Sequence, residues 1–475
     1  MRKAAVLLGA IAWLLVAAHG QATDGQVDLS FSTDGTANVL FNLGGDHQDR
    51  GVAATILRDG KIVLVGSAEF ASDPGSGNPN DTDFAIARLN PSGALDTTFD
   101  SDGKRSVPFD LGGTGRLRDS ATSVLPEAGG GVTVCGSAEI PTLGFDPVLT
   151  RLTSAGAIDT TVGPPATPGR VRLFPNSTFD VLICDLTRLR SGAILATLGV
   201  EGYDAPTRLA RLLPSTLALD TTFDGDGYAE EELCGSGAFD YCQFRQTVEL
   251  PTGKLLSVGW SQQGSALENA TVVRFNADGT RDTSFGTNGV VVLDPPGGSP
   301  GVLERVRGVG LQRDGRPVLL VDSGGTSYLT RLNGAAVDTT FGVGGWRSAN
   351  VSGSTFPVVA ERIWIQSDDR ILLAGEDPGP LGLGGNIKVW RWDRQAAALD
   401  ASFGSGGVQT VWLGQDPLAA PVLESMAAPD GRILVVGTAY IQTDDDLGVA
   451  RLTNALVFDD GFEVGSTFFW PGVRP

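Results

Sequence analysis

The 475-residue sequence carries 35 basic and 55 acidic side chains, and its formal net charge of −20 disfavours binding to nucleic acid or to an anionic membrane surface. Only 19% of the residues are charged, which argues against a disordered acidic chain, and the 65 glycines favour many short strands and tight turns over a bundle of helices. Since there are only two histidines, His19 and His47, a multi-histidine metal site is excluded.

Residues 1–20, MRKAAVLLGAIAWLLVAAHG, have the pattern of a secretory signal peptide. Arg2 and Lys3 precede an apolar run, and Ala18 and Gly20 are the small residues that a cleavage site requires. The apolar run is shorter than the ~20 residues that a membrane span needs. We therefore expect a secreted protein, periplasmic or extracellular, that has no transmembrane segment in its mature chain and is a monomer.

The four cysteines of a secreted chain are expected to form disulfides. Cys234 and Cys242 enclose a short glycine-containing loop in ELCGSGAFDYC and are predicted to pair. Cys135 and Cys184 lie in apolar, strand-like runs. For these two residues the pattern is equally compatible with a disulfide and with buried free thiols.

An aspartate-rich phrase, ALDTTFDSDG at residues 94–103, recurs along the chain. Related copies read ALDTTFDGDG, TRDTSFGTNG, AVDTTFGVGG and ALDASFGSGG, and seven copies follow one another at intervals of about 60 residues. An arginine that ends an apolar run precedes the aspartate of six copies by seven to nine residues. Such a regular period indicates a repeat architecture.

Each repeat is consistent with four short strands. Two apolar runs flank a turn such as Asp59-Gly60, which predicts a hairpin because glycine supplies the positive φ of a tight turn. The run from Ile62 to Val65 is apolar at consecutive positions, so both faces of that strand should be buried. We therefore predict an all-β fold, a seven-bladed β-propeller of four-stranded blades over residues 21–453. A β-solenoid, which would leave two open ends, is the alternative.

The combination of DGKIVLVG, FAIARLN and LDTTFDSDG resembles the delta-60 repeat family, which occurs in secreted or surface-associated bacterial proteins. The resemblance covers nearly the whole mature chain. The third copy, IDTTVGPPATPG, departs from the pattern because it lacks the phenylalanine. The resemblance implies a repeat fold and no particular activity.

We predict that the repeated phrase forms the seam between neighbouring blades. The aspartate would bind backbone amides of its own turn, with the preceding arginine nearby, while the phenylalanine fills the space between two blades. The predicted seam residues are Asp96, Phe99, Asp220, Phe223, Asp282, Phe285, Asp338, Phe341, Asp400 and Phe403.

Calcium binding is the other interpretation of the same phrase. Asp100 and Asp102, like Asp224 and Asp226, place two carboxylates before a glycine, as in oxygen-rich calcium loops. These loops lack the further ligands and the distal glutamate of such sites. We therefore predict no metal and no cofactor, with calcium at these four aspartates as the weaker alternative.

In such a propeller, one face carries the regular Asp-Gly turns and seams, and the opposite face carries loops that differ between repeats. Because functional residues favour variable loops on rigid scaffolds, this variable face is the expected binding surface. Its candidate residues are Asp81, Asp83, Asp444, Asp445 and Asp446, for which a solvated acidic rim is the alternative. Six tryptophans offer either a sugar-stacking surface or blade packing: Trp260, Trp346, Trp364, Trp390, Trp392 and Trp412.

The sequence assigns no catalytic residue. It favours a binding or interaction scaffold for a protein or carbohydrate ligand over an enzyme. The alternative is an extracellular carbohydrate-active hydrolase or lyase that uses carboxylates on the variable face. The C-terminal segment, residues 454–475, is expected either to close the ring against residues 24–41 or to act as a sorting tail.

Overall fold

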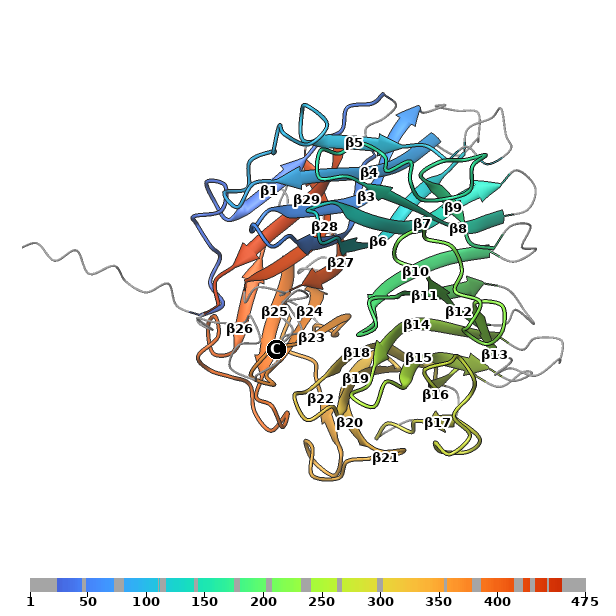
Figure 1. Cartoon of the computed structure of the whole chain (residues 1–475). Helices are drawn as coiled ribbons and strands as arrows, with labels where there is room; N and C mark the ends of the chain where they lie inside the picture. The colour runs from blue at the N-terminus through green and yellow to red at the C-terminus, as the bar shows by residue number, and fades with distance from the viewer. Residues whose placement is uncertain are drawn as a thin grey trace, which may run out of the picture.

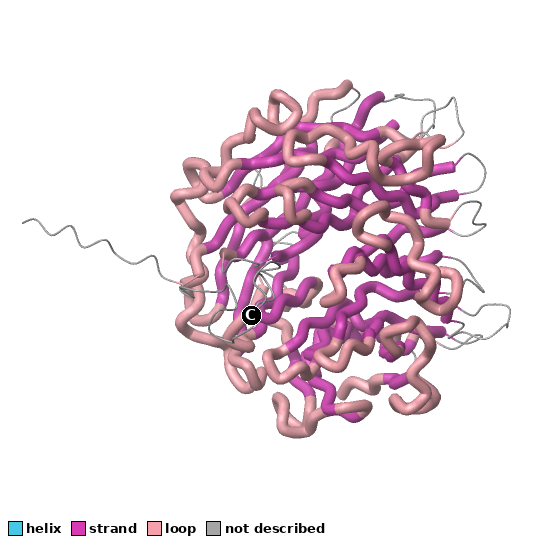
Figure 2. Tube along the Cα trace, viewed as in Figure 1, coloured by secondary structure: helices cyan, strands magenta, loops and turns pink. Residues whose placement is uncertain are grey.

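The computed structural model describes residues 24–44, 48–71, 81–109, 111, 117–140, 144–174, 180–201, 207–231, 241–262, 267–296, 302–353, 357–377, 386–413, 422–427, 432–441 and 444–454. These residues form strands, turns and loops and contain no helix (Figure 2). A helix able to cross a membrane is accordingly not found in this part of the chain. The predicted signal peptide, His47 and Cys234 lie outside the described residues.

Seven antiparallel sheets, the blades, follow one another around a ring (Figure 1). The first blade comprises β2 (Arg50–Ile56), β3 (Ile62–Ala71), β4 (Asp81–Leu89) and β5 (Lys104–Val107). The second comprises β6 (Asp119–Pro126), β7 (Val132–Ile140), β8 (Gly144–Leu152) and β9 (Arg170–Arg172). The third comprises β10 (Asp180–Arg188), β11 (Ile194–Glu201), β12 (Thr207–Leu212) and β13 (Tyr228–Glu231).

The remaining four blades repeat this order. The fourth comprises β14 (Tyr241–Glu249), β15 (Leu255–Gln262), β16 (Asn269–Phe275) and β17 (Val290–Val292). The fifth comprises β18 (Glu304–Leu311), β19 (Pro317–Ser323), β20 (Thr326–Asn333) and β22 (Trp346–Ser348), with the short β21 (Ala336–Val337) beside β20. The sixth comprises β23 (Arg362–Ile365), β24 (Ile371–Asp377), β25 (Asn386–Trp392) and β26 (Val408–Val411).

The seventh blade joins the two ends of the described chain. It comprises β27 (Val422–Ala427), β28 (Ile433–Ile441), β29 (Asp444–Leu452) and, as its outer strand, β1 (Thr36–Val39). In Figure 1 the blue β1 lies beside the red β29, and Thr36 pairs with Ala450 in antiparallel register. The protein is therefore the predicted seven-bladed propeller, and the closed ring rules out the solenoid.

Bonds between residues 24–39 and the end of the described chain close the ring, and the predicted ring-closing or sorting role of residues 454–475 stays a prediction. Beyond the strand pairing, the Gly25 N–H donates to the carbonyl of Thr453 at 2.7 Å and the Asp28 N–H donates to the carbonyl of Arg451 at 2.8 Å. A four-stranded last blade needs an outer strand, and β1 supplies it. The segment after Asn454 lies outside the described residues.

The core lies between the blades and explains the consecutive apolar residues of each second strand. In β3, Ile62 and Leu64 pack with residues of the seventh blade, whereas Val63 and Val65 pack with residues of the second blade. All four side chains are buried. Because alternate side chains of a strand point to opposite faces, a strand sandwiched between two blades must be apolar at every position.

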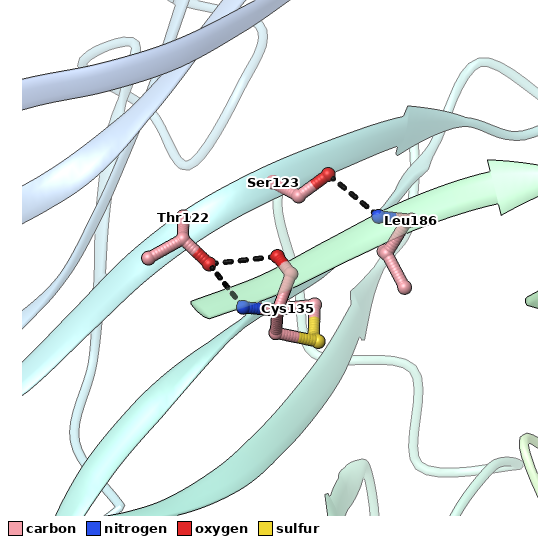
Figure 3. Close-up of a disulfide and its surroundings, with 5 residues drawn as sticks. Thr122, Ser123, Cys135 and Leu186 are labelled. Carbon is pink, nitrogen blue, oxygen red and sulfur yellow. Dashed lines mark hydrogen bonds between the residues drawn. A yellow bond between two sulfur atoms is a disulfide. The ribbon is translucent and has the colours of Figure 1, made fainter. Parts of the chain in front are cut away.

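A disulfide links two neighbouring blades. Cys135 of β7 and Cys184 of β10 are bonded, with their Cα atoms 5.9 Å apart (Figure 3). Beside them the Thr122 hydroxyl of β6 donates to the Cys184 carbonyl at 2.8 Å, and the Ser123 hydroxyl accepts the Leu186 N–H at 3.0 Å. The open question about this pair is thus resolved in favour of a disulfide.

Cys242, at the start of β14, is also disulfide-bonded. Its predicted partner, Cys234, lies outside the described residues, so the pairing of these two cysteines stays a prediction.

Candidate functional site

The repeated aspartate joins its own turn to the arginine of the preceding strand. In the first blade, Oδ1 of Asp96 accepts the N–H of Thr98 at 3.1 Å and its hydroxyl at 2.7 Å. Oδ2 accepts Nε–H of Arg88 at 2.7 Å. The Arg88 guanidinium lies 4.7 Å from the centre of the Phe99 ring, within range of a cation–π interaction.

The same three-residue arrangement occurs at six junctions. The arginine–aspartate pairs are Arg88–Asp96, Arg211–Asp220, Arg274–Asp282, Arg331–Asp338, Arg391–Asp400 and Arg451–Asp28, with Nε to Oδ2 distances of 2.6 to 2.9 Å. Their phenylalanines, each exposed by 1% or less, are Phe99, Phe223, Phe285, Phe341, Phe403 and Phe31.

These arginines also reach the following blade. Arg211 donates through Nη1 to the carbonyl of Ala277 at 2.7 Å, and Arg88 donates to the carbonyl of Ser154. Arg391 donates to the carboxylate of Asp24, across the point where the ring closes. In these three groups the arginine therefore connects two blades.

The second blade lacks this arrangement, although the spacing of Arg151 and Asp159 is within the range of the other pairs. Val162 takes the place of the phenylalanine and is fully buried. Arg151 donates to the hydroxyl of Thr133 at 3.2 Å and lies 3.5 Å from Glu127. Asp159 keeps its own turn, accepting the N–H and hydroxyl of Thr161.

The seam aspartates are held in their ionised form. Burial alone would raise the pKa of Asp96, but hydrogen bonds from Thr98 and Lys61 and the charge of Arg88 outweigh it, so the pKa is lowered. A hydrogen bond from the Thr340 side chain, aided by Arg331 and opposed by burial, lowers the pKa of Asp338 to about 2. Such carboxyl groups are poor proton donors at neutral pH.

The four calcium candidates mostly bind their own loops. Oδ1 of Asp102 accepts the N–H of Lys104 at 2.9 Å, and Oδ1 of Asp226 accepts the N–H of Tyr228 at 2.8 Å. Asp100 pairs with Arg105 at 3.1 Å.

The fourth candidate, Asp224, is exposed. Partial desolvation, with the charges of Asp226, Asp278 and Glu230, raises its pKa. Among the described residues, there is no group of three or more histidine, cysteine, aspartate or glutamate side chains that could hold a metal ion.

The variable-face candidates occupy equivalent positions in the first and seventh blades, which are neighbours in the ring. Asp83 pairs in register with Ala68, and Asp446 pairs with Ala439; both aspartates are buried. Asp81 accepts the N–H of Leu117, at the joint with the next blade.

Asp445 lies at the corresponding joint, where its carbonyl accepts the N–H of Asp49 at 3.0 Å. The backbone of Asp444 begins β29, and its side chain is outside the described part of the structure. Asp81 and Asp445 therefore lie at joints between blades, whereas Asp83 and Asp446 are buried and do not form an open acidic rim.

A pocket of about 660 Å³ lies at the outer rim, between the fifth and sixth blades. It is lined on one side by β22 with Trp346 and Arg347, and on the other by β25 with Lys388 and Trp392. The Arg347 guanidinium lies 4.6 Å from the centre of the Trp392 ring. Tyr328 of β20 meets the Trp346 ring edge-on, with ring centres 6.2 Å apart.

Sequence reasoning found only part of this pocket. Trp346 and Trp392 were recognised as candidates for either sugar stacking or packing, whereas Arg347 and Lys388 were not singled out. The sequence did contain a signal for this pocket. The residue that follows the repeated arginine of the third strand is Trp392 in the sixth blade, whereas five other repeats have leucine there. Those leucines are Leu89, Leu152, Leu212, Leu332 and Leu452.

A further carboxyl group, that of Asp185, lies on the first strand of the third blade. Burial raises the pKa of Asp185 on β10 to about 7, although Arg245 on β14 and a hydrogen bond from Ser123 on β6 oppose the shift. These three side chains come from the first strands of three consecutive blades. Sequence analysis did not single out Asp185.

Three segments, residues 57–99, 250–285 and 428–462, match a family model described as "Domain of unknown function (DUF5122) beta-propeller". The sequence is that of a β-propeller repeat protein. This agrees with the architecture above, although the specific delta-60 name is not part of the match. A search of curated proteins found no significant match.

Solved structures similar to this β-propeller include two polysaccharide lyases. Uly1 has a TM-score of 0.49 and 10% identity, over 93% of this chain and 94% of that one. The PL25 ulvan lyase bound to -[GlcA(1-4)Rha3S]- has a TM-score of 0.45 and 11% identity, over 91% and 94%. A Trypanosoma rangeli sialidase complex has a TM-score of 0.40 and 12% identity, over 90% and 59%. Likenesses this distant carry no argument about activity.

Proposed function

We propose that this chain is a secreted or surface-associated propeller of the delta-60 type that acts as a binding scaffold for a carbohydrate or protein ligand. The observation that carries the proposal is the rim pocket with Trp346, Arg347 and Trp392. Its volume of about 660 Å³ lies in the range of ligand sites, which are lined by aromatic side chains and a few polar groups. Tryptophan and arginine are also the residues that dominate binding energy at interfaces.

The seam geometry supports a scaffold role for the repeated aspartates. In each of the six complete junctions, the carboxylate bonds to an arginine and to the following turn. Their recurrence around the ring supports a role in blade assembly, and we expect binding at features that are specific to single blades.

Binding without turnover is the test of this proposal. The mature chain would be applied to a glycan array and a panel of extracellular polysaccharides, and each bound polysaccharide would then be incubated with the protein and sized by gel filtration. A scaffold retains its ligand at unchanged length. Shortening of a bound polysaccharide would contradict the proposal.

One observation favours an enzyme as the second candidate function. Asp185 interacts with Ser123 and Arg245, which come from the first strands of the two neighbouring blades, and burial raises its pKa to about 7, where a carboxyl group is suited to proton transfer. A hydrolase or lyase would then use the inner strands instead of the variable-face carboxylates. If any polysaccharide is shortened, Asp185→Asn should abolish the shortening while binding persists; undiminished cleavage by the variant would exclude this role.

A further inference from the structure

We infer that the rim pocket between the fifth and sixth blades binds an acidic oligosaccharide, whose uronate carboxylate is recognised by Arg347. This inference rests on the proposed scaffold function and specifies its ligand class. The pocket combines a guanidinium that has no ion pair within the described structure, a partly exposed aromatic ring and a second, buried tryptophan among its lining residues. Each of these is a separate observation.

The buried tryptophan of the pocket is Trp392. This residue lines the pocket and is 4% exposed, yet its Nε1 has no hydrogen-bond partner within the described structure. Trp390, on the same strand, shows the usual arrangement, because its Nε1 donates to the carbonyl of Ala349 at 2.9 Å. The Nε1 of Trp392 is itself closed to solvent, so Trp392 contributes its ring and not its N–H to the pocket.

The guanidinium is that of Arg347. It contacts the Trp392 ring, and the described residues provide it with no ion pair. Arg105 occupies the equivalent position on the outer strand of the first blade, where it pairs with Asp100 at 3.1 Å. The fork of N–H groups on arginine matches a carboxylate, so Arg347 is suited to an anionic group on a ligand.

The second cation of the pocket, Lys388, is already neutralised. Its Nζ lies 3.1 Å from Asp377 and donates to the carbonyl of Ser352 at 2.7 Å. Arg347 is therefore the uncompensated positive charge among the lining residues. The acidic protein as a whole repels anions, but its distant charges are screened beyond about 8 Å at physiological salt, so the local charge decides which anion binds.

Trp346 supplies a flat apolar wall. Its ring is half-buried and is held by the edge-on contact with Tyr328. At this position of the outer strand the other repeats carry Lys104, Arg170, Tyr228, Val290, Val408 and Thr36. An amphipathic aromatic ring suits the less polar face of a sugar, while the guanidinium of Arg347 binds its oxygens.

The pocket favours an oligosaccharide over a protein partner. A stable protein interface buries about 800 Å² on each partner, whereas this site is a single open depression in which the guanidinium of Arg347, unpaired among the described residues, lies beside a tryptophan ring. We therefore argue for the sugar and treat a protein partner as an outcome of the test.

Isothermal titration calorimetry of the mature chain with trigalacturonate tests the inference, with cellotriose as the uncharged ligand of equal length. The variant is Arg347→Gln, and Arg105→Gln is its matched control in the first blade. We expect trigalacturonate to bind the wild type and the control equally. Arg347→Gln should weaken this binding roughly tenfold or more, to the level of cellotriose, because a charge-assisted bond is lost.

Trp392→Leu, which introduces the residue found in five other repeats, provides a second readout. It should weaken the binding of both sugars, because the pocket loses the ring that lines it and that contacts Arg347. If this variant does not fold, Arg347→Gln decides alone.

Two results would overturn the inference: no binding of trigalacturonate at millimolar concentration, or equal binding by the wild type and Arg347→Gln. Binding of another glycan or a protein in the array, without turnover, would then leave the scaffold proposal standing. Shortening of a glycan would instead contradict the scaffold proposal itself.

Discussion

At the residue scale, the repeated aspartate is the smallest unit of the architecture. Its short side chain reaches the N–H and hydroxyl of the residue two positions later, as Asp338 does with Thr340 at 3.0 and 2.6 Å. The other carboxylate oxygen of Asp338 remains available for Arg331 at 2.9 Å. Aspartate suits this position because its carboxylate can accept both sets of bonds at once.

Substitution of Asp338 by asparagine should destabilise the protein. Arg331 is 1% exposed, so the loss of its ionised partner leaves a buried guanidinium incompletely satisfied. We expect the free energy of unfolding to fall by about 1–3 kcal/mol, measured by urea denaturation. The matched control is Asp159→Asn, since Asp159 bonds to Thr161 while Arg151 is engaged elsewhere. Equal losses in the two variants would contradict the role assigned to the arginine.

Asp185 should give the stability a pH dependence of the opposite sign to that of the seam aspartates. Its folded pKa of about 7 exceeds the unfolded value of about 3.9, so the folded state holds a proton between these pH values. The stabilisation of the folded state by this proton is fully present below pH 4 and is lost as the pH rises through 7. Asp185→Asn should therefore gain in Tm over the wild type between pH 4 and 8. A Tm difference independent of pH would refute this.

At the element scale, the strands could be predicted because their patterns are local. The consecutive apolar residues of β3 indicated burial on both faces, and packing of Ile62 and Val63 against different blades is the physical reason. Partners on separate blades could not be predicted in the same way. The Cys135–Cys184 bond and the meeting of Arg347 with Trp392 both depend on the packing of one blade against the next.

The disulfide between β7 and β10 should contribute measurably to stability. Its cysteines are 49 residues apart in the sequence, and a crosslink of this span restricts the unfolded chain. The double substitution Cys135→Ala and Cys184→Ala should lower the free energy of unfolding by about 2–4 kcal/mol. Thermal unfolding by circular dichroism would report it. An unchanged Tm would show that the bond adds nothing to the inter-blade contacts.

At the scale of the whole molecule, the ring depends on the first described strand. Removal of residues 21–41 deletes β1 and leaves β29 as an exposed edge, which invites association between chains. We expect this variant to melt earlier and to elute as oligomers in gel filtration. A truncation after Asn454 retains every closing bond described above and serves as the control. A monomeric first variant with the Tm of the control would contradict this mode of closure.

The central claim is that the aspartate-rich phrase joins blades and is not a calcium site. The most direct test is the Tm of the mature chain, measured in millimolar calcium and again in excess chelator, because a ligand that binds only the folded state raises the Tm. We expect the same Tm in both solutions, because the seam carboxylates are already bonded to arginine and to their own turns. A clear rise in calcium that disappears in the Asp224→Asn and Asp226→Asn double variant would contradict it.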